Sequence, residues 1–80
     1  MNFNNWLNTL IEEKNINLDE QFEVQGEMGT NFMQYYNVIE AMKTAPAHEQ
    51  KAIKDMLVRI DFANGDIKHY FRHLAQALAV

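Results

Sequence analysis

Three residues near the C-terminal end of the chain have side chains that can bind a metal ion. In the stretch GDIKHYFRHLAQAL, Asp66, His69 and His73 follow one another at intervals of three and four residues, which places them on one side of a helix. A histidine pair of this spacing can hold Zn²⁺, but a specific site needs a third or fourth ligand and hydrogen bonds that orient the ligands. On a helical projection the three side chains point away from the apolar stripe. We therefore predict two solvent-exposed histidines beside Asp66 as an N-cap, with no cofactor. A metal-binding helical protein that uses His69 and His73 is kept as an alternative.

The remaining residues offer little for catalysis. Cysteine and serine are both absent from the chain, so the usual nucleophiles are missing. His48 follows Pro46 closely and has no converging titratable groups that would make it a general base. Gly26 and Gly29 in QGEMGT precede a predicted helix, but no lysine follows them as in a phosphate-binding loop. We predict that the protein is not an enzyme, with no catalytic residues.

The acidic residues are unevenly distributed along the chain. The formal net charge is −4. Residues 1–30 carry a net charge of −5, because Lys14 is their one base, and residues 31–80 carry +1. The acidic residues of the first part are Glu12, Glu13, Asp19, Glu20, Glu23 and Glu27. Such a surface repels a phosphate backbone and attracts a basic protein surface. We therefore expect a protein partner with a basic surface and no binding to nucleic acid.

Hydrophobic periodicity predicts a helical protein. Apolar residues recur at helical spacing over residues 3–14, 31–44, 47–61 and 67–78, and residues 17–26 are interpreted as a short helix that ends near Gly26. Gly65 is expected in the left-handed conformation between the last two helices. The predicted fold class is all-α: a single domain over residues 1–80, built as a small bundle of four or five short helices.

One segment supports a different fold class. Asn64-Gly65 is the strongest short hairpin signal, and Val58, Ile60, Phe62 and Ile67 alternate as in strands. The alternative is therefore an α+β fold with a hairpin at residues 57–71. Helical spacing of the apolar residues after Gly65, together with several alanines, favours the helix pair.

A second alternative concerns function. The stretch LIEEKNINLDEQFEVQG could form the first helix, the break and the second helix of a helix-turn-helix-like DNA-binding regulator. Asn31, Gln34 and Asn37 of the next helix would then contact the bases. That helix carries one lysine, Lys43, and no arginine. Affinity for DNA depends largely on cationic contacts with phosphates, so we rank this alternative below protein binding.

The sequence therefore predicts a non-enzymatic acidic interaction module, an adaptor or inhibitor that docks on a basic partner protein. A nucleic-acid-binding protein would be one form of such a partner. The six acidic residues would face the partner, and Trp6 or Phe22 would supply an apolar anchor. Nine aromatic residues and five methionines favour an apolar surface patch, and hence a homo-oligomer, most simply a dimer. No stretch reaches the roughly 18 apolar residues of a membrane span. A chain without cysteine fits the cytoplasm.

Overall fold

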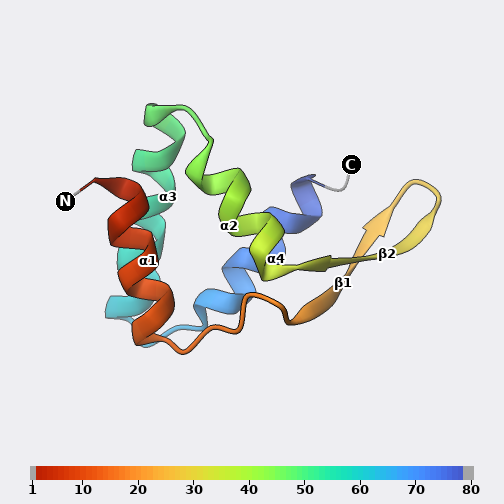
Figure 1. The fold of residues 1–80 in the computed structure, drawn as a ribbon, viewed down its shortest axis with the longest axis horizontal. Helices are drawn as coiled ribbons and strands as arrows, with labels where there is room; N and C mark the ends of the chain where they lie inside the picture. Colours follow the sequence, from red (N-terminus) through yellow and green to blue (C-terminus); the bar gives the residue numbers. More distant parts are fainter. Residues whose placement is uncertain (1, 79–80) are drawn as a thin grey trace.

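A computed structural model describes residues 2–78 of the chain (Figure 1). The elements follow in the order α1 (Phe3–Glu13), β1 (Gln21–Gly26), β2 (Gly29–Gln34), α2 (Tyr35–Lys43), α3 (Ala47–Phe62) and α4 (Ile67–Leu78). The two strands form an antiparallel hairpin. The fold is therefore α+β, and the all-α helical bundle predicted from the sequence is wrong.

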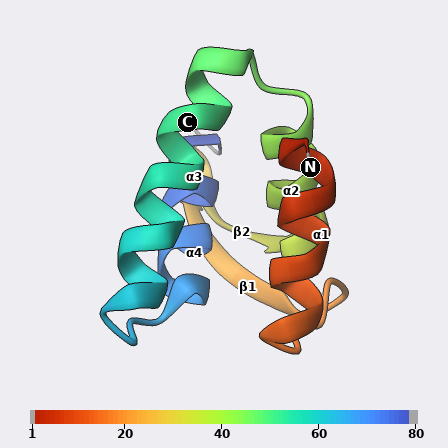
Figure 2. The ribbon, with the colours of Figure 1, turned by 90° about the vertical axis from the view of Figure 1, so that its left-hand side faces the viewer.

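The helices form a body from which the hairpin projects (Figure 1). α4 packs against α2 and β1, while α3 contacts α1, α2 and α4. Seen from the side of α1, α1 and α3 stand side by side, and the strands run behind them (Figure 2). The described chain measures 39 × 25 × 21 Å, and the projecting hairpin lies along the longest dimension.

One apolar core joins the helices to the base of the hairpin. Tyr35, at the junction of β2 and α2, is buried at its centre, with its ring 4.7 Å from that of Phe22 and 6.3 Å from that of Phe71. Aromatic pairs at such distances are favourable beyond the area that they bury. The other buried core residues are Leu7, Leu10, Ile11, Ile16, Val24, Val38, Ile39, Met42, Leu57, Ile67 and Ala75. The core therefore fixes the hairpin to the body through β1 and through the start of α2.

Asparagines in the left-handed conformation end two of the helices. Asn15 after α1 has φ 53° and Asn64 after α3 has φ 56°. In both turns the next residue donates its N–H to a carbonyl five residues back, as Ile16 does to Ile11 (3.1 Å) and Gly65 does to Ile60 (2.8 Å). This is the Schellman pattern. The prediction that Gly65 takes the left-handed position is wrong, because Asn64 takes it.

Gly65 has a packing role instead. A Cβ at this position would lie 2.9 Å from Ile60 Cγ2 and 3.2 Å from the Ile60 carbonyl oxygen. The segment 57–71 thus consists of the end of α3, a tight turn and the start of α4. The hairpin proposed there as an alternative does not form, although the α+β class to which it belonged is the class found.

The hairpin lies at residues 21–34, where the sequence predicted helix. Gln21 to Gly26 pair with Gln34 to Gly29 without a bulge. Phe22 and Val24 face the body, and Gln21, Glu23 and Gln25, which alternate with them, are exposed. This is the alternation of a strand with one buried face. The predicted short helix over 17–26 is therefore wrong, and the helix predicted over 31–44 begins only at Tyr35.

Candidate interaction surface

The six acidic residues predicted to bind a partner lie along one border of the molecule. Glu12 and Glu13 end α1, Asp19 and Glu20 lie in the connection to the hairpin, Glu23 is on β1, and Glu27 is in the hairpin turn. In Figure 1 this stretch runs from the lower end of α1, along the lower border, to the tip of the hairpin at the right. All six are exposed. We call these six residues the acidic border.

Most of the acidic border is free of ion pairs within the chain. Glu20 accepts a hydrogen bond from Lys68 Nζ at 3.2 Å. Among residues 2–78, the other five carboxylates have no lysine, arginine or histidine within ion-pair distance. Lys14, the base nearest in sequence to Glu12 and Glu13, pairs with Asp61 of α3 instead. The border therefore presents a nearly uncompensated row of negative charge.

The two predicted apolar anchors are partly enclosed. Trp6 is half-buried against the core and has Lys54 Nζ 5.3 Å from its ring centroid, a cation–π distance. Phe22 is half-buried and packs on Tyr35. Neither side chain stands free beside the acidic border, because each already packs within the chain.

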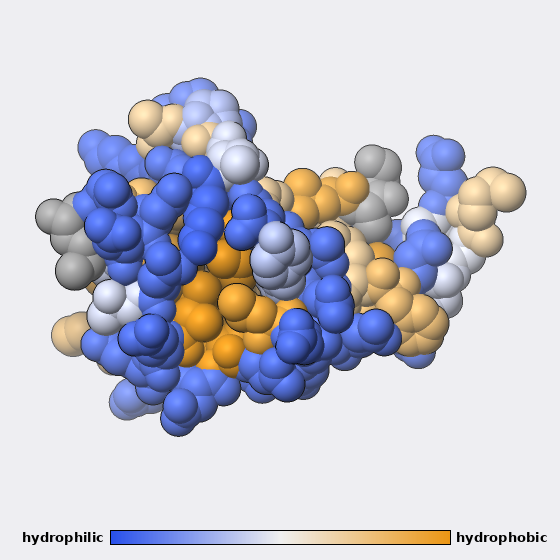
Figure 3. Space-filling view, in the orientation of Figure 1, coloured by the Kyte–Doolittle hydropathy of each residue, from blue (hydrophilic) through white to orange (hydrophobic). Residues whose placement is uncertain are grey.

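Different apolar residues accompany the border on the hairpin. Phe32 is 63% exposed and pairs directly with Glu23 across the strands. Met28 is 99% exposed next to Glu27 at the hairpin tip. The space-filling view shows apolar residues on the hairpin arm at the right, in addition to those at the centre of the body (Figure 3). Sequence periodicity missed Phe32 and Met28 because it placed them on or before a helix.

A side chain of α4 closes the outer edge of β1. The backbone N–H of Gln25 donates to Gln76 Oε1 at 2.9 Å, and Gln76 Nε2 donates to the carbonyl oxygen of Gln25. The carboxamide thus takes the place that a neighbouring strand would occupy. A strand edge left open is a template for pairing with another chain, and Gln76 removes that property from β1 at this point.

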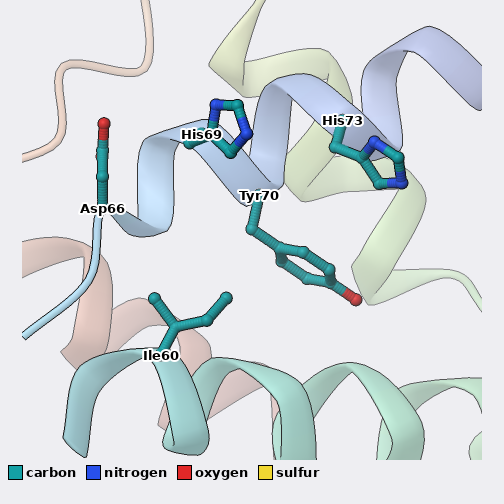
Figure 4. Close-up of a pocket in the computed structure, with 5 residues that line it drawn as sticks. All are labelled: Ile60, Asp66, His69, Tyr70 and His73. Carbon is teal, nitrogen blue, oxygen red and sulfur yellow. The ribbon is translucent and has the colours of Figure 1, made fainter. Parts of the chain in front are cut away.

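The metal candidates lie beside a shallow depression between α3 and α4. Asp66, His69, Tyr70 and His73 line it together with Ile60, around a volume of about 610 Å³. Figure 4 shows Tyr70 extended toward α3, the two imidazoles turned in different directions and Asp66 set apart at the start of the helix. Within residues 2–78, no three His, Cys, Asp or Glu side chains are close enough to hold a metal ion.

Asp66 has a structural role in this depression. Its Oδ1 accepts the N–H of Lys68 at 2.9 Å, which is the N-cap interaction that the sequence predicted. Its other oxygen lies 3.7 Å from Arg72 Nη2. Partial burial raises the pKa of the Tyr70 hydroxyl above its usual value. These contacts account for Asp66 as part of the fold, and Tyr70 packs against the core as a partly buried residue.

The helix-turn-helix suggested by the stretch from Leu10 to Gly26 and the helix after it is not formed, because residues 21–34 are a hairpin. Asn31 and Gln34 belong to β2, and the N–H of Gln34 donates to Asn37 Oδ1 at 2.9 Å. The three polar residues therefore do not share the face of one recognition helix.

Comparison of the chain with protein-family models, with curated proteins and with solved structures gives no match in any of the three. Within residues 2–78, each helix is too short or too polar to cross a membrane.

Proposed function

We propose that the protein is a non-enzymatic interaction module, an adaptor or inhibitor, that docks its acidic border on a basic surface of a partner protein. The observation that carries this proposal is the position of the charges. Five of the six exposed carboxylates have no ion-pair partner within residues 2–78, and the chain segment that carries the six residues runs along one border of the molecule (Figure 1). Uncompensated charge of one sign attracts a surface of the opposite sign and speeds encounter with it.

The hairpin would supply the apolar part of the contact. Charged contacts give orientation and association rate, while buried aromatic and methionine side chains provide much of the affinity. Phe32 and Met28 project next to Glu23 and Glu27, so acidic and apolar groups meet on one arm. We therefore assign the anchor to Phe32 and Met28 in place of Trp6 and Phe22.

The partner class follows from the sign of the charge. A basic groove that normally binds nucleic acid would accept the acidic border, and the module would then compete with that nucleic acid. We propose such a partner in the cytoplasm.

A charge-reversal pair tests this function. Glu23→Lys/Glu27→Lys reverses two charges of the acidic border, and Glu40→Lys/Asp55→Lys makes the same net change on α2 and α3. Both pairs involve exposed residues. We expect affinity capture from the native host with the unmodified chain to retain a basic protein that elutes at high salt, where charge interactions are screened.

The two variants must then behave differently. The border variant should lose the captured protein, and the α2/α3 variant should keep it. Retention by the border variant, or equal loss from both variants, would contradict the proposal.

A further inference from the structure

The edge of β2 that faces away from β1 has unpaired backbone groups. In an antiparallel ladder, residue pairs alternate between hydrogen-bonded and non-hydrogen-bonded. Because Gln25 bonds Gln76 through both of its backbone groups, its pair with Thr30 is non-hydrogen-bonded, and the N–H and C=O of Thr30 point outward. The Glu23–Phe32 pair, two residues along, is of the same kind. Within residues 2–78, no group outside the hairpin bonds the backbone of Thr30 or Phe32.

β2 also lacks the features that normally protect an edge strand. Such strands carry charges, proline or a bulge that prevent pairing with another chain. The strand Gly29–Gln34 has the sequence GTNFMQ, with no charge and no proline, and its register contains no bulge. Thr30 and Asn31 are exposed. The opposite edge differs, because Gln76 covers β1 and Glu23 adds a charge there.

We infer that two copies of this chain pair through β2, antiparallel, to form a four-stranded sheet in the order β1-β2-β2-β1. The uncharged strand favours a second copy as occupant, because a strand can approach its own copy without like-charge repulsion. A second copy would also extend the part of the hairpin that projects from the body (Figure 1), where further strands add stability to a two-stranded sheet.

The free backbone groups select one register. The N–H of Gln34 is already bonded to Asn37, so Thr30 and Phe32 supply the outward-facing groups. A two-fold axis that places Thr30 opposite Phe32 of the second copy, and Phe32 opposite its Thr30, forms four backbone hydrogen bonds. Asn31 then faces Asn31 of the second copy on the axis. The two Phe32 residues become diagonal neighbours on one face of the sheet, which is within reach of aromatic side chains.

This pairing ends at two chains. Each β2 edge is consumed by the other, and the outer β1 edges are covered at Gln25 by Gln76. A self-complementary two-fold contact closes, whereas a head-to-tail contact would grow into a filament. The contact area of one strand pair is small, so the dimer belongs to the class of weak, reversible assemblies.

A single cysteine tests the register. The chain contains no cysteine, so any disulfide in a one-cysteine variant joins two copies. Non-hydrogen-bonded antiparallel pairs have Cα atoms about 4.5 Å apart, within the disulfide range of about 4.4–6.8 Å. Asn31→Cys should therefore cross-link under mild oxidation. Thr30→Cys is the matched control, because the two Thr30 Cα atoms would lie about 8–9 Å apart, beyond that range. Cross-linking of both variants, or of neither, overturns the proposal.

Sedimentation equilibrium tests the dimer without a cross-link. From about 10 μM to 1 mM, the span expected for a weak contact, the average mass of the unmodified chain should rise from one chain toward two. Phe32→Lys places a charge at the pairing edge and should keep the mass at one chain. Gln21→Lys adds the same charge to the exposed face of β1 and should follow the unmodified chain. Two outcomes overturn the proposal. One is a single-chain mass for the unmodified protein at 1 mM, which is expected if β2 instead pairs with a strand of another protein. The other is dimerisation of Phe32→Lys.

Discussion

The side-chain amide of Gln76 is bonded to both backbone groups of Gln25, a residue 51 positions earlier in the chain. This contact ties the last helix to the first strand and fixes the outer edge of the hairpin. The hairpin carries Glu23 and Glu27, so the contact also sets how these carboxylates are presented to a partner.

Replacement of Gln76 should therefore loosen β1 at Gln25. Gln76→Ala removes both hydrogen bonds. Hydrogen exchange measured by NMR should therefore show that the Gln25 amide exchanges its proton with solvent distinctly faster than in the unmodified chain. Gln76→Glu is the matched variant, because its carboxylate still accepts the Gln25 N–H but has no N–H to donate. It should keep the amide protected. The global cost of Gln76→Ala should be about 1 kcal/mol, since net hydrogen-bond contributions are of that size. Unchanged exchange in Gln76→Ala would refute this role.

The left-handed asparagines should respond to substitution according to backbone conformation. A left-handed residue with a Cβ costs roughly 1–2 kcal/mol, and asparagine avoids part of this cost. Asn15→Ala and Asn64→Ala should each lower the free energy of unfolding by about 1 kcal/mol in urea titrations. Asn15→Gly and Asn64→Gly should be neutral or slightly stabilising, because glycine adopts this conformation freely. Equal effects of alanine and glycine would show that the conformation is not what matters.

The Tyr35 hydroxyl should be coupled to Arg72. Arg72 Nη1 donates to the Tyr35 oxygen at 2.7 Å in a partly buried position. Tyr35→Phe keeps the ring in the core and removes this bond, so it should cost about 1–2 kcal/mol of stability. Arg72→Met should cost a similar amount. In the double variant the two losses should not add, and a double-mutant cycle from urea unfolding should give a clear coupling energy. Additive losses would mean that the bond contributes nothing.

The helices were predictable because their signals are local. The apolar stripes at helical spacing predicted α1, α3 and α4 to within one residue at each end, and Asp66 was identified as a cap from its position. The Asn64-Gly65 pair fits two structures, because a left-handed asparagine occurs both in a hairpin turn and at a Schellman helix end. The helical spacing of the apolar residues on both sides correctly favoured the helix pair over the hairpin.

The hairpin was not predictable from its turn. Its two-residue loop is Glu27-Met28, neither of which has a positive φ, while Gly29 takes φ 120°. Two-residue hairpin loops usually carry Asn-Gly or Asp-Gly, so the sequence gives no standard signal here. Phe22 and Val24 do alternate as a strand, but only Val24 is fully buried. The contact that secures β1 comes from Gln76, and such a distant pairing has no local signature.

The loss of folding stability at alkaline pH should depend on Tyr70. Burial raises the pKa of its hydroxyl in the folded chain, so folding favours the protonated form. Stability from this group is fully present below the unfolded pKa of about 10 and is lost as the pH rises through the folded value. The free energy of unfolding should therefore fall above about pH 10. Tyr70→Phe should flatten that fall, whereas Tyr36→Phe, which alters a ring that is 49% exposed, should leave it in place. Urea titrations between pH 8 and pH 11 measure the difference, and an identical decline in all three proteins would exclude Tyr70 as its source.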